Sequence, residues 1–293
     1  MTHLLSPAEI DQLKGLKFSL PKLLEKGQTG RHQASQKGSS VEFSQHRDYA
    51  PGDPIRHLDW KAYARSEKFV IKEFESESNL QVLLVLDRSL SMEHHDSGAL
   101  TKLAYACQLI HGLTWLLLQQ GDAVGLVSFS NDEPTFLPPS GAANQIHQIE
   151  HQLKHLSPQG KTSFRAIIEF INVHCRRNTV CVFVSDLLDD EHLADQKLIQ
   201  LKKSRFSTYC LHLLTAGEYR LKGDDPTLFQ DPETSEILLS EPQAIRDAYA
   251  EAIDEWLNTV HNACTHHGIA YAFTTTATPP VRTIYSLMGY DAQ

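Results

Sequence analysis

The chain has 293 residues, of which 41% are hydrophobic and 22% are charged, a composition typical of a folded protein with a large core. This length predicts one or two domains. The formal net charge of −9 creates no overall positive field, so the composition argues against nucleic acid as a partner.

The sequence carries no signal for membrane attachment or secretion. No apolar run approaches the roughly 18 residues of a membrane span. Leu4 and Leu5 are followed at once by Ser6-Pro7-Ala8-Glu9, which leaves no apolar core for a signal peptide. The five cysteines include no Cys-x-x-Cys pair. Reduced, mostly buried thiols and a cytoplasmic location are therefore expected.

Residues 1–78 are expected to form an N-terminal helix, a linker and an accessory lobe. A capping box at Ser6, with proline at the first helical position, predicts a short helix. Residues 27–40 are rich in Gly, Ser, Gln and Lys, which is typical of an irregular linker. Residues 41–78 combine a Pro-Gly-Asp turn with an extended segment at Phe69–Phe74, which predicts a β-rich lobe beside the main sheet.

Residues 79–293 alternate apolar strands with amphipathic helices. The first strand is the unbroken apolar run Val82–Leu86, which suits a strand buried on both faces, although a buried helix segment could begin in the same way. Further strands are expected near 124–129, 134–137, 179–184, 207–214 and 270–273, and helices near 99–120, 142–156, 164–175 and 191–204.

Three features complete this region. A hairpin insertion is expected within residues 217–240. A capping box at Ser240 predicts the start of a long helix that Gly268 ends, and a short helix is expected after Thr278. The alternation of strands and helices predicts an α/β fold with a doubly wound, mostly parallel sheet.

Polar side chains gather where two of the buried strands end. Asp87, Ser89 and Ser91 follow the first strand as Asp-x-Ser-x-Ser, and Asp186 follows the strand at 179–184. Because parallel strands end at one edge of a sheet, the two carboxylates should converge there, and the Thr162 hydroxyl could reach the same point. These oxygens suit Mg²⁺, with Mn²⁺ or Ca²⁺ as alternatives. If the carboxylates bind through water, the ion keeps enough charge to attract a carboxylate from another molecule.

These five positions resemble the metal-ion-dependent adhesion site of von Willebrand factor A domains. An upstream block looks like the hallmark of the "domain of unknown function 58" family. Its residues are Ser40-Val41-Glu42-Phe43, Arg47-Asp48-Tyr49, Pro51-Gly52-Asp53, Arg56, Asp59-Trp60 and Ala64-Arg65. The resemblance runs from about Gly30 to Thr276 and implies a von Willebrand factor A-like domain at 79–293. It also implies a MoxR-type AAA-plus ATPase as partner. Many members carry N-terminal membrane spans, which this sequence lacks.

The upstream arginines leave two interpretations open. Arg47, Arg56 and Arg65 could form a site for an anion or a partner. They could equally form an internal network with neighbouring aspartates, since guanidinium groups pair readily with carboxylates. Trp60 is expected to be a core anchor between lobes. His212, inside a strand, is expected to be a core histidine with its hydrogen bonds satisfied.

Three functions compete for this arrangement. The leading hypothesis is a metal-dependent protein–protein interaction module, an adaptor or assembly factor whose partner supplies Asp or Glu to the ion. The second is a metal-dependent hydrolase of phosphate esters. The motif contains no clear general base, P-loop or Gly-x-Ser-x-Gly elbow, so we expect no enzyme. The third is a metal-free scaffold that uses the accessory lobe and the hairpin for contacts.

Overall fold

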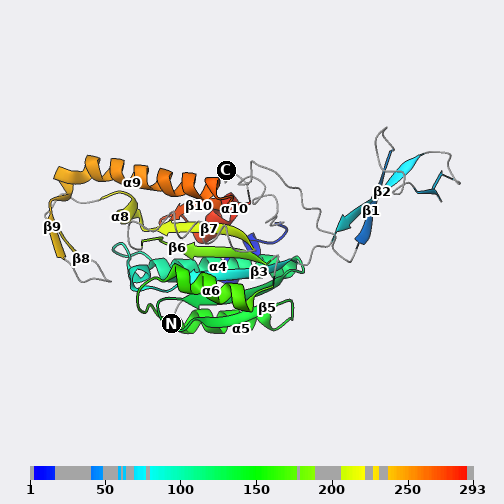
Figure 1. Ribbon diagram of the computed structural model, residues 1–293, viewed down its shortest axis with the longest axis horizontal. Coiled ribbons are helices and arrows are strands. Elements are labelled where there is room, and N and C mark those ends of the chain that lie inside the picture. Colours follow the sequence, from blue (N-terminus) through cyan, green and yellow to red (C-terminus); the bar gives the residue numbers. More distant parts are fainter. Residues whose placement is uncertain are drawn as a thin grey trace. The chain divides into compact units, whose positions relative to one another are not determined.

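A computed structural model gives the fold (Figure 1) and describes residues 3–16, 41–48, 59–60, 62–63, 69–76, 80–176, 179–188, 206–221, 227–230 and 237–288. The chain divides into two compact units, residues 1–31 with 80–293, and residues 32–79. The predicted linker at 27–40 and the predicted helix at 191–204 lie outside the described residues.

The larger unit is built on a six-stranded sheet with the order β10-β7-β6-β3-β4-β5. All neighbouring strands pair in parallel except β4 and β5, which are antiparallel. The predicted α/β fold with a mostly parallel sheet is therefore confirmed, with β5 as its antiparallel edge. The strands are β3 (Gln81–Asp87), β4 (Ala123–Phe129), β5 (Thr135–Ser140), β6 (Val180–Ser185), β7 (Ser207–Leu214) and β10 (Ala270–Thr275).

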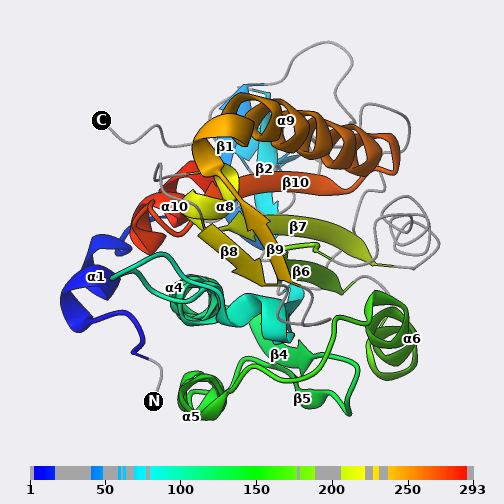
Figure 2. The ribbon, with the colours of Figure 1, turned by 90° about the vertical axis from the view of Figure 1, so that its left-hand side faces the viewer.

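Helices cover both faces of this sheet (Figure 2). Val82, Leu84 and Leu86 of β3 join the core on one face, and Leu83 and Val85 join the core on the other. Because side chains alternate along a strand, one unbroken apolar run serves both cores. The first face carries α1 (Pro7–Gln12), α4 (Lys102–Gln119), α5 (Gln145–His155) and α10 (Pro280–Leu287), and the second carries α6 (Phe164–His174) and α9 (Pro242–His266).

The N-terminal helix belongs to the larger unit, which differs from the expected division near residue 78. Ser6 begins α1 through the predicted capping box, its backbone N–H donating to Glu9 Oε2 at 2.8 Å. Leu5 and Leu13, on either side of α1, are buried in the core that α4 and α10 share. The apolar residues that flank α1, rather than the following linker, decide where this helix packs.

The predicted hairpin insertion is confirmed, but the start of the helix after it is not. β8 (Thr227–Gln230) and β9 (Ile237–Ser240) pair antiparallel, with Ser240 opposite Thr227. Helix α9 instead has Glu241 as its N-cap, without a side-chain cap, so the capping box predicted at Ser240 is wrong. Ser240 is the last residue of β9 and pairs with Thr227. It therefore lies one position before the N-cap of α9 and cannot cap this helix.

The smaller unit contains the predicted β-rich lobe. β1 (Val41–Asp48) pairs antiparallel with β2 (Val70–Ser76). Tyr63 stacks on Phe69 with ring centroids 4.4 Å apart, and Trp60 meets Tyr63 edge-on at 6.4 Å. Trp60 is 59% exposed, and its role as a core anchor between lobes stays a prediction.

The cysteines agree with the prediction of mostly buried thiols. All five are free and four of them are buried. Burial raises the pKa of Cys107 to about 12 and that of Cys175 to about 11. In the part of the chain that the structure describes, no helix has both the length and the apolar character needed to cross a membrane.

The close approach of β5 to β4 predicts that Gly125 cannot be enlarged. A Cβ at Gly125 would lie 2.6 Å from the Pro139 nitrogen and 2.7 Å from the Leu137 carbonyl oxygen, both backbone atoms. We expect Gly125→Ala to lower the free energy of unfolding by about 2 kcal/mol, measured by chemical denaturation. A Cβ at Gly141 would meet nothing closer than 3.9 Å, so Gly141→Ala should change it by less than about 0.5 kcal/mol. Equal losses in the two variants would contradict this packing.

Candidate functional site

The predicted site lies at the carboxyl edge of the sheet, where β3 ends between two neighbours. Asp87 is the last residue of β3 and Ser185 the last of β6, and the two strands pair in parallel with Leu86 opposite Val184. β4 pairs with β3 on its other side. The strand that follows β3 in the chain, β4, therefore lies on one side of it, and the later strand β6 lies on the other. At such a point of an α/β sheet, a crevice for ligands opens beyond the carboxyl ends of the strands.

Asp87 is the centre of a buried cluster of oxygen atoms. Its Oδ1 accepts the backbone N–H of Ser89 at 2.9 Å, and its Oδ2 accepts the hydroxyls of Thr162 at 3.2 Å and Ser185 at 2.7 Å. The hydroxyls of Ser89 and Ser91 lie 3.0 Å apart. Ser91 stands in the short 3₁₀ helix η2 (Leu90–Glu93) that follows. Four of the five predicted residues, Asp87, Ser89, Ser91 and Thr162, thus meet.

Thr162 reaches this cluster because its loop is bound to the residues after β3. The Gln159 N–H donates to the Arg88 carbonyl at 2.7 Å, and the Leu90 N–H donates to the Gly160 carbonyl at 2.9 Å. Gly160 has a φ of 67°, a conformation that glycine adopts without strain. This loop therefore brings the Thr162 hydroxyl to Asp87, 75 positions away in the sequence.

Asp186, the fifth predicted residue, is fully buried but faces other partners. Its Oδ2 accepts from Lys102 Nζ at 2.8 Å, and its Oδ1 accepts from the Leu188 N–H at 3.2 Å. Lys102 Nζ also donates to Glu218 Oε1 at 2.6 Å. The side chains of Lys102 and Asp186 are 0% exposed and that of Glu218 is 19% exposed. Asp186 acts on Asp87 by electrostatic repulsion, and no hydrogen bond joins the two side chains.

Lys102 and Glu218 are site residues that the sequence analysis missed. Lys102 is the only Asp, Glu, Lys or Arg in α4 and stands at its N-terminal end, where the helix dipole disfavours a cation. A single lysine at this unfavourable position of an apolar helix indicates that its charge has a partner elsewhere in the fold. Glu218 lies in α8 (Ala216–Tyr219), a short helix that was not predicted, and its capping box with Thr215 was the one local clue.

The side chains of Asp87, Asp186, Lys102 and Glu218 together carry more negative than positive charge. Burial and the nearby Asp186 raise the pKa of Asp87 to about 6, although hydrogen bonds from Ser89 and Ser185 oppose the shift. Burial lowers the pKa of Lys102, but Asp186 and Glu218 outweigh that effect and hold it above its usual value. Three carboxylates therefore face one ammonium, which leaves a formal charge of −2 when all are ionised.

The donors around Asp87 fit a hard divalent cation. One carboxylate and the hydroxyls of Ser89, Ser91 and Thr162 are oxygen ligands of the kind that Mg²⁺ accepts. The ion pairs of the described residues include none to Asp87. No set of three or more His, Cys, Asp or Glu side chains within the described ranges could hold a metal, so hydroxyls and water would supply most ligands. A divalent charge would cancel the formal −2 of the group.

His212 is a satisfied core histidine, as predicted. It is fully buried, with Nε2 2.8 Å from the Asp186 carbonyl oxygen and Nδ1 2.8 Å from the Tyr271 hydroxyl. Burial lowers its pKa to about 4, so the ring is neutral at pH 7. His212 therefore supports the backbone behind Asp186 and adds no charge to the site.

The arginine series stays a prediction. Arg56 and Arg65 lie outside the described residues, and for Arg47 the structure describes the backbone of β1 alone. Neither the anion or partner site nor the internal network is tested.

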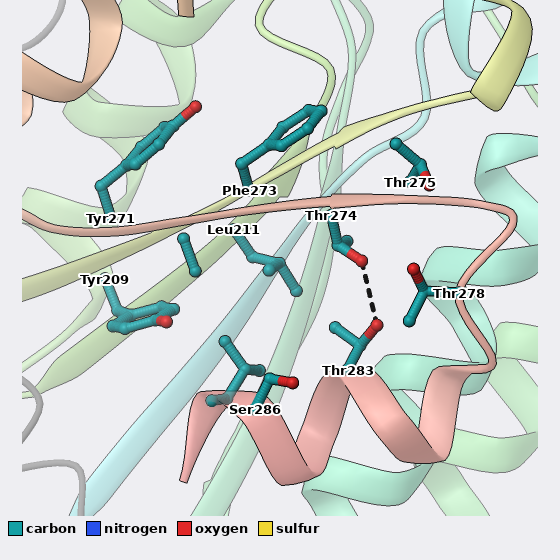
Figure 3. Close-up of a pocket in the computed structure, with 11 residues that line it drawn as sticks. Tyr209, Leu211, Tyr271, Phe273, Thr274, Thr275, Thr278, Thr283 and Ser286 are labelled. Atoms are coloured by element: carbon teal, nitrogen blue, oxygen red, sulfur yellow. Dashed lines mark hydrogen bonds between the residues drawn. The ribbon is translucent and has the colours of Figure 1, made fainter. Parts of the chain in front are cut away.

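A separate cavity of about 450 Å³ lies beside β10 and α10 (Figure 3). Its wall includes the hydrogen-bonded pair Thr274 and Thr283, whose hydroxyls are 2.9 Å apart. None of its described lining residues is acidic, basic or a histidine, and burial raises the pKa of both lining tyrosines. This cavity therefore offers no general base or charged metal ligand. The lining consists of Tyr209, Leu211, Tyr271, Ala272, Phe273, Thr274, Thr275, Thr278, Thr283, Ser286 and Leu287.

Sequence comparison connects the chain to one family. The family model described as "Protein of unknown function DUF58" matches residues 45–256. "Uncharacterized protein YeaD" of Bacillus subtilis is 28% identical over 173 residues, which cover 58% of this chain and 41% of YeaD. "Uncharacterized protein Rv1480" of Mycobacterium tuberculosis is 22% identical over 244 residues, covering 82% of this chain and 76% of that protein. The chain thus spans less than half the length of YeaD.

Solved structures that are similar to this chain include two from other proteins. BatB from Bacteroides thetaiotaomicron is 16% identical with a TM-score of 0.46, covering 72% of this chain and 97% of BatB. The SpRpn10 VWA domain is 12% identical with a TM-score of 0.42, covering 73% of this chain and 98% of that domain. At these values the likeness concerns the arrangement of elements alone.

The contacts of Ser185 predict that its hydroxyl stabilises the buried Asp87 carboxylate. It donates to Asp87 Oδ2 at 2.7 Å and accepts from the Leu187 N–H at 3.0 Å. Ser185→Ala leaves both groups one partner short, so we expect a loss of about 2 kcal/mol in the free energy of unfolding, measured by urea denaturation. Ser163→Ala is the matched control, because Ser163 makes no side-chain cap to α6 and its loss should change stability by less than about 0.5 kcal/mol. A neutral Ser185→Ala would contradict this role.

Proposed function

The chain belongs to the family described as "Protein of unknown function DUF58", and from this premise we propose that it is a metal-dependent protein-interaction module. The observation that carries the proposal is the buried Asp87 carboxylate, which has neutral hydrogen-bond donors in place of a cationic partner. A buried charge of this kind is costly unless another charge compensates it. The carboxyl edge of the sheet is therefore the proposed binding edge.

Four side chains would hold the cation, and a fifth would act at longer range. Asp87, Ser89, Ser91 and Thr162 supply the oxygen atoms, and Asp186 adds negative charge beside them. Mg²⁺ is the first candidate, with Mn²⁺ or Ca²⁺ as alternatives. A bound divalent ion would supply a positive centre at which a carboxylate oxygen of another protein can coordinate.

The proposed partner is a protein that presents an Asp or Glu side chain at its surface. The family resemblance of the upstream block suggests a MoxR-type AAA-plus ATPase, for which this chain would be an adaptor or assembly factor. Recognition through one carboxylate sets orientation and specificity, while surrounding surface contacts supply most of the affinity.

Binding is proposed in preference to hydrolysis. Hydrolysis of a phosphate ester needs a free general base or an activated nucleophile near the ion. Lys102, Asp186 and Glu218 are paired with one another, and both ring nitrogens of His212 lie within hydrogen-bonding distance of partners. Asp87 is then the remaining titratable group of the described cluster, and it is the proposed ligand.

Cation binding by the isolated chain is the first test of this proposal. Isothermal titration with MgCl₂ should show one site in the wild-type protein, and Asp87→Asn should weaken binding by more than about tenfold because it removes the only charged ligand. Thr162→Val should weaken it less, and Ser163→Ala should leave it unchanged. Equal affinity in wild type and Asp87→Asn would place any cation elsewhere, and a wild type that binds none would favour the metal-free scaffold.

Partner binding is the second test. A purified MoxR-type ATPase, immobilised without nucleotide, should retain the wild-type chain in Mg²⁺ and release it in EDTA. Asp87→Asn should not be retained in either buffer, which separates loss of this site from any effect of EDTA on the ATPase. Ser163→Ala should behave as wild type. Retention that survives both EDTA and Asp87→Asn would remove the metal from the interaction.

A further inference from the structure

Lys102 places a positive charge against Asp186, the carboxylate whose charge acts on Asp87. Its side chain is 0% exposed, and its ammonium lies 2.8 Å from Asp186 Oδ2 and 2.6 Å from Glu218 Oε1. Two carboxylates hold the pKa of this group above its usual value in spite of burial. The charge is therefore a permanent part of the site's surroundings.

We propose that Lys102 and Glu218 set the affinity of the Asp87 cluster for its cation without touching it. This inference rests on the proposed function and adds the residues that regulate that site. Lys102 acts as an internal counter-charge that neutralises Asp186, so that a divalent ion at Asp87 is attracted less strongly. Glu218 shares the Lys102 ammonium and thereby leaves more of the Asp186 charge effective.

The geometry separates these residues from the ligand set. Both carboxylate oxygens of Asp186 are engaged, one by Lys102 and the other by the Leu188 N–H. Among the described residues, the hydrogen bonds of Asp87 go to Ser89, Thr162 and Ser185, and none goes to Lys102 or Glu218. The influence of the pair on a cation must therefore pass through the electric field, which is strong in a buried, water-poor site.

Glu218 is held in place by a second set of contacts. Its Oε2 accepts from the Thr215 N–H at 2.7 Å, and its own N–H donates to the Thr215 hydroxyl at 3.1 Å. One carboxylate oxygen is thus fixed by the start of α8 and leaves the other for Lys102. Glutamine at this position keeps one acceptor oxygen and removes the negative charge.

An electrostatic role makes the two substitutions act in opposite directions. Lys102→Met removes a positive charge and should tighten Mg²⁺ binding by about tenfold or more, whereas Glu218→Gln removes a negative charge and should weaken it by about tenfold. A merely structural role would loosen the site in both variants and weaken binding in both. The opposite signs are therefore the readout that a structural role does not produce.

The experiment is isothermal titration of MgCl₂ into wild type, Lys102→Met and Glu218→Gln, with Mg²⁺-dependent thermal shifts as a second readout. Lys102→Met leaves two buried carboxylates without their cation and lowers metal-free stability. If Lys102→Met does not fold, Glu218→Gln is compared with Glu218→Asp, which keeps the negative charge and should bind Mg²⁺ within about twofold of wild type, whereas a structural role would weaken binding in both. Arg165→Met is the control, since it removes an equal charge from an exposed pair with Glu169 on α6 and should leave affinity within about twofold.

The outcomes distinguish this inference from the proposed function. Wild-type binding that tightens in Lys102→Met and weakens in Glu218→Gln supports both. Wild-type binding with no change in these variants, or with weaker binding in Lys102→Met, overturns the inference alone. Binding by Lys102→Met but not by wild type supports the inference and overturns metal dependence of the natural chain. Absence of binding in all variants overturns both.

Discussion

The burial of the Asp87 carboxylate at the end of β3 is the constraint on which the site depends. A carboxylate without contact to water needs hydrogen bonds, opposite charge or protonation. Asp87 has hydrogen bonds from Ser89, Thr162 and Ser185, and its pKa nevertheless rises to about 6. Neutral donors therefore compensate only part of the cost, and this shortfall is the basis for proposing a cation at the site.

The sheet explains how residues so distant in sequence reach one point. β3 is apolar on both faces and pairs with β4 and β6, so its end lies inside the molecule rather than at an edge strand. Parallel pairing brings Ser185 to Asp87 across 98 positions, and a loop bound to the residues after β3 brings Thr162 across 75. The same burial that stabilises the sheet removes the carboxylates from water.

The parts that the sequence predicts well are those with a local pattern. The apolar run Val82–Leu86, the Asp-x-Ser-x-Ser after it and the polar residues that end β6 are each visible within a few positions. The Lys102 pairs are different, because they join residues 84 and 116 positions apart and depend on where α4 and α8 begin. The prediction of a capping box at Ser240 was wrong for a related reason. Ser240 pairs with Thr227 in the β8–β9 hairpin and therefore ends a strand instead of capping the helix.

Asp87 and Asp186 stand side by side but have their charges compensated in two different ways. Asp186 has a fixed cation, the ammonium of Lys102, which is covalently part of the chain and cannot leave. Asp87 has no such cation among the ion pairs of the described residues. It is surrounded by hydroxyl groups, which suit an exchangeable ion. A second lysine whose ammonium paired with Asp87 would stabilise the fold more simply. Its ammonium would, however, occupy the position that a bound ligand needs. The unequal treatment of two adjacent carboxylates is therefore the strongest physical argument that this edge of the sheet is built for binding rather than for stability alone.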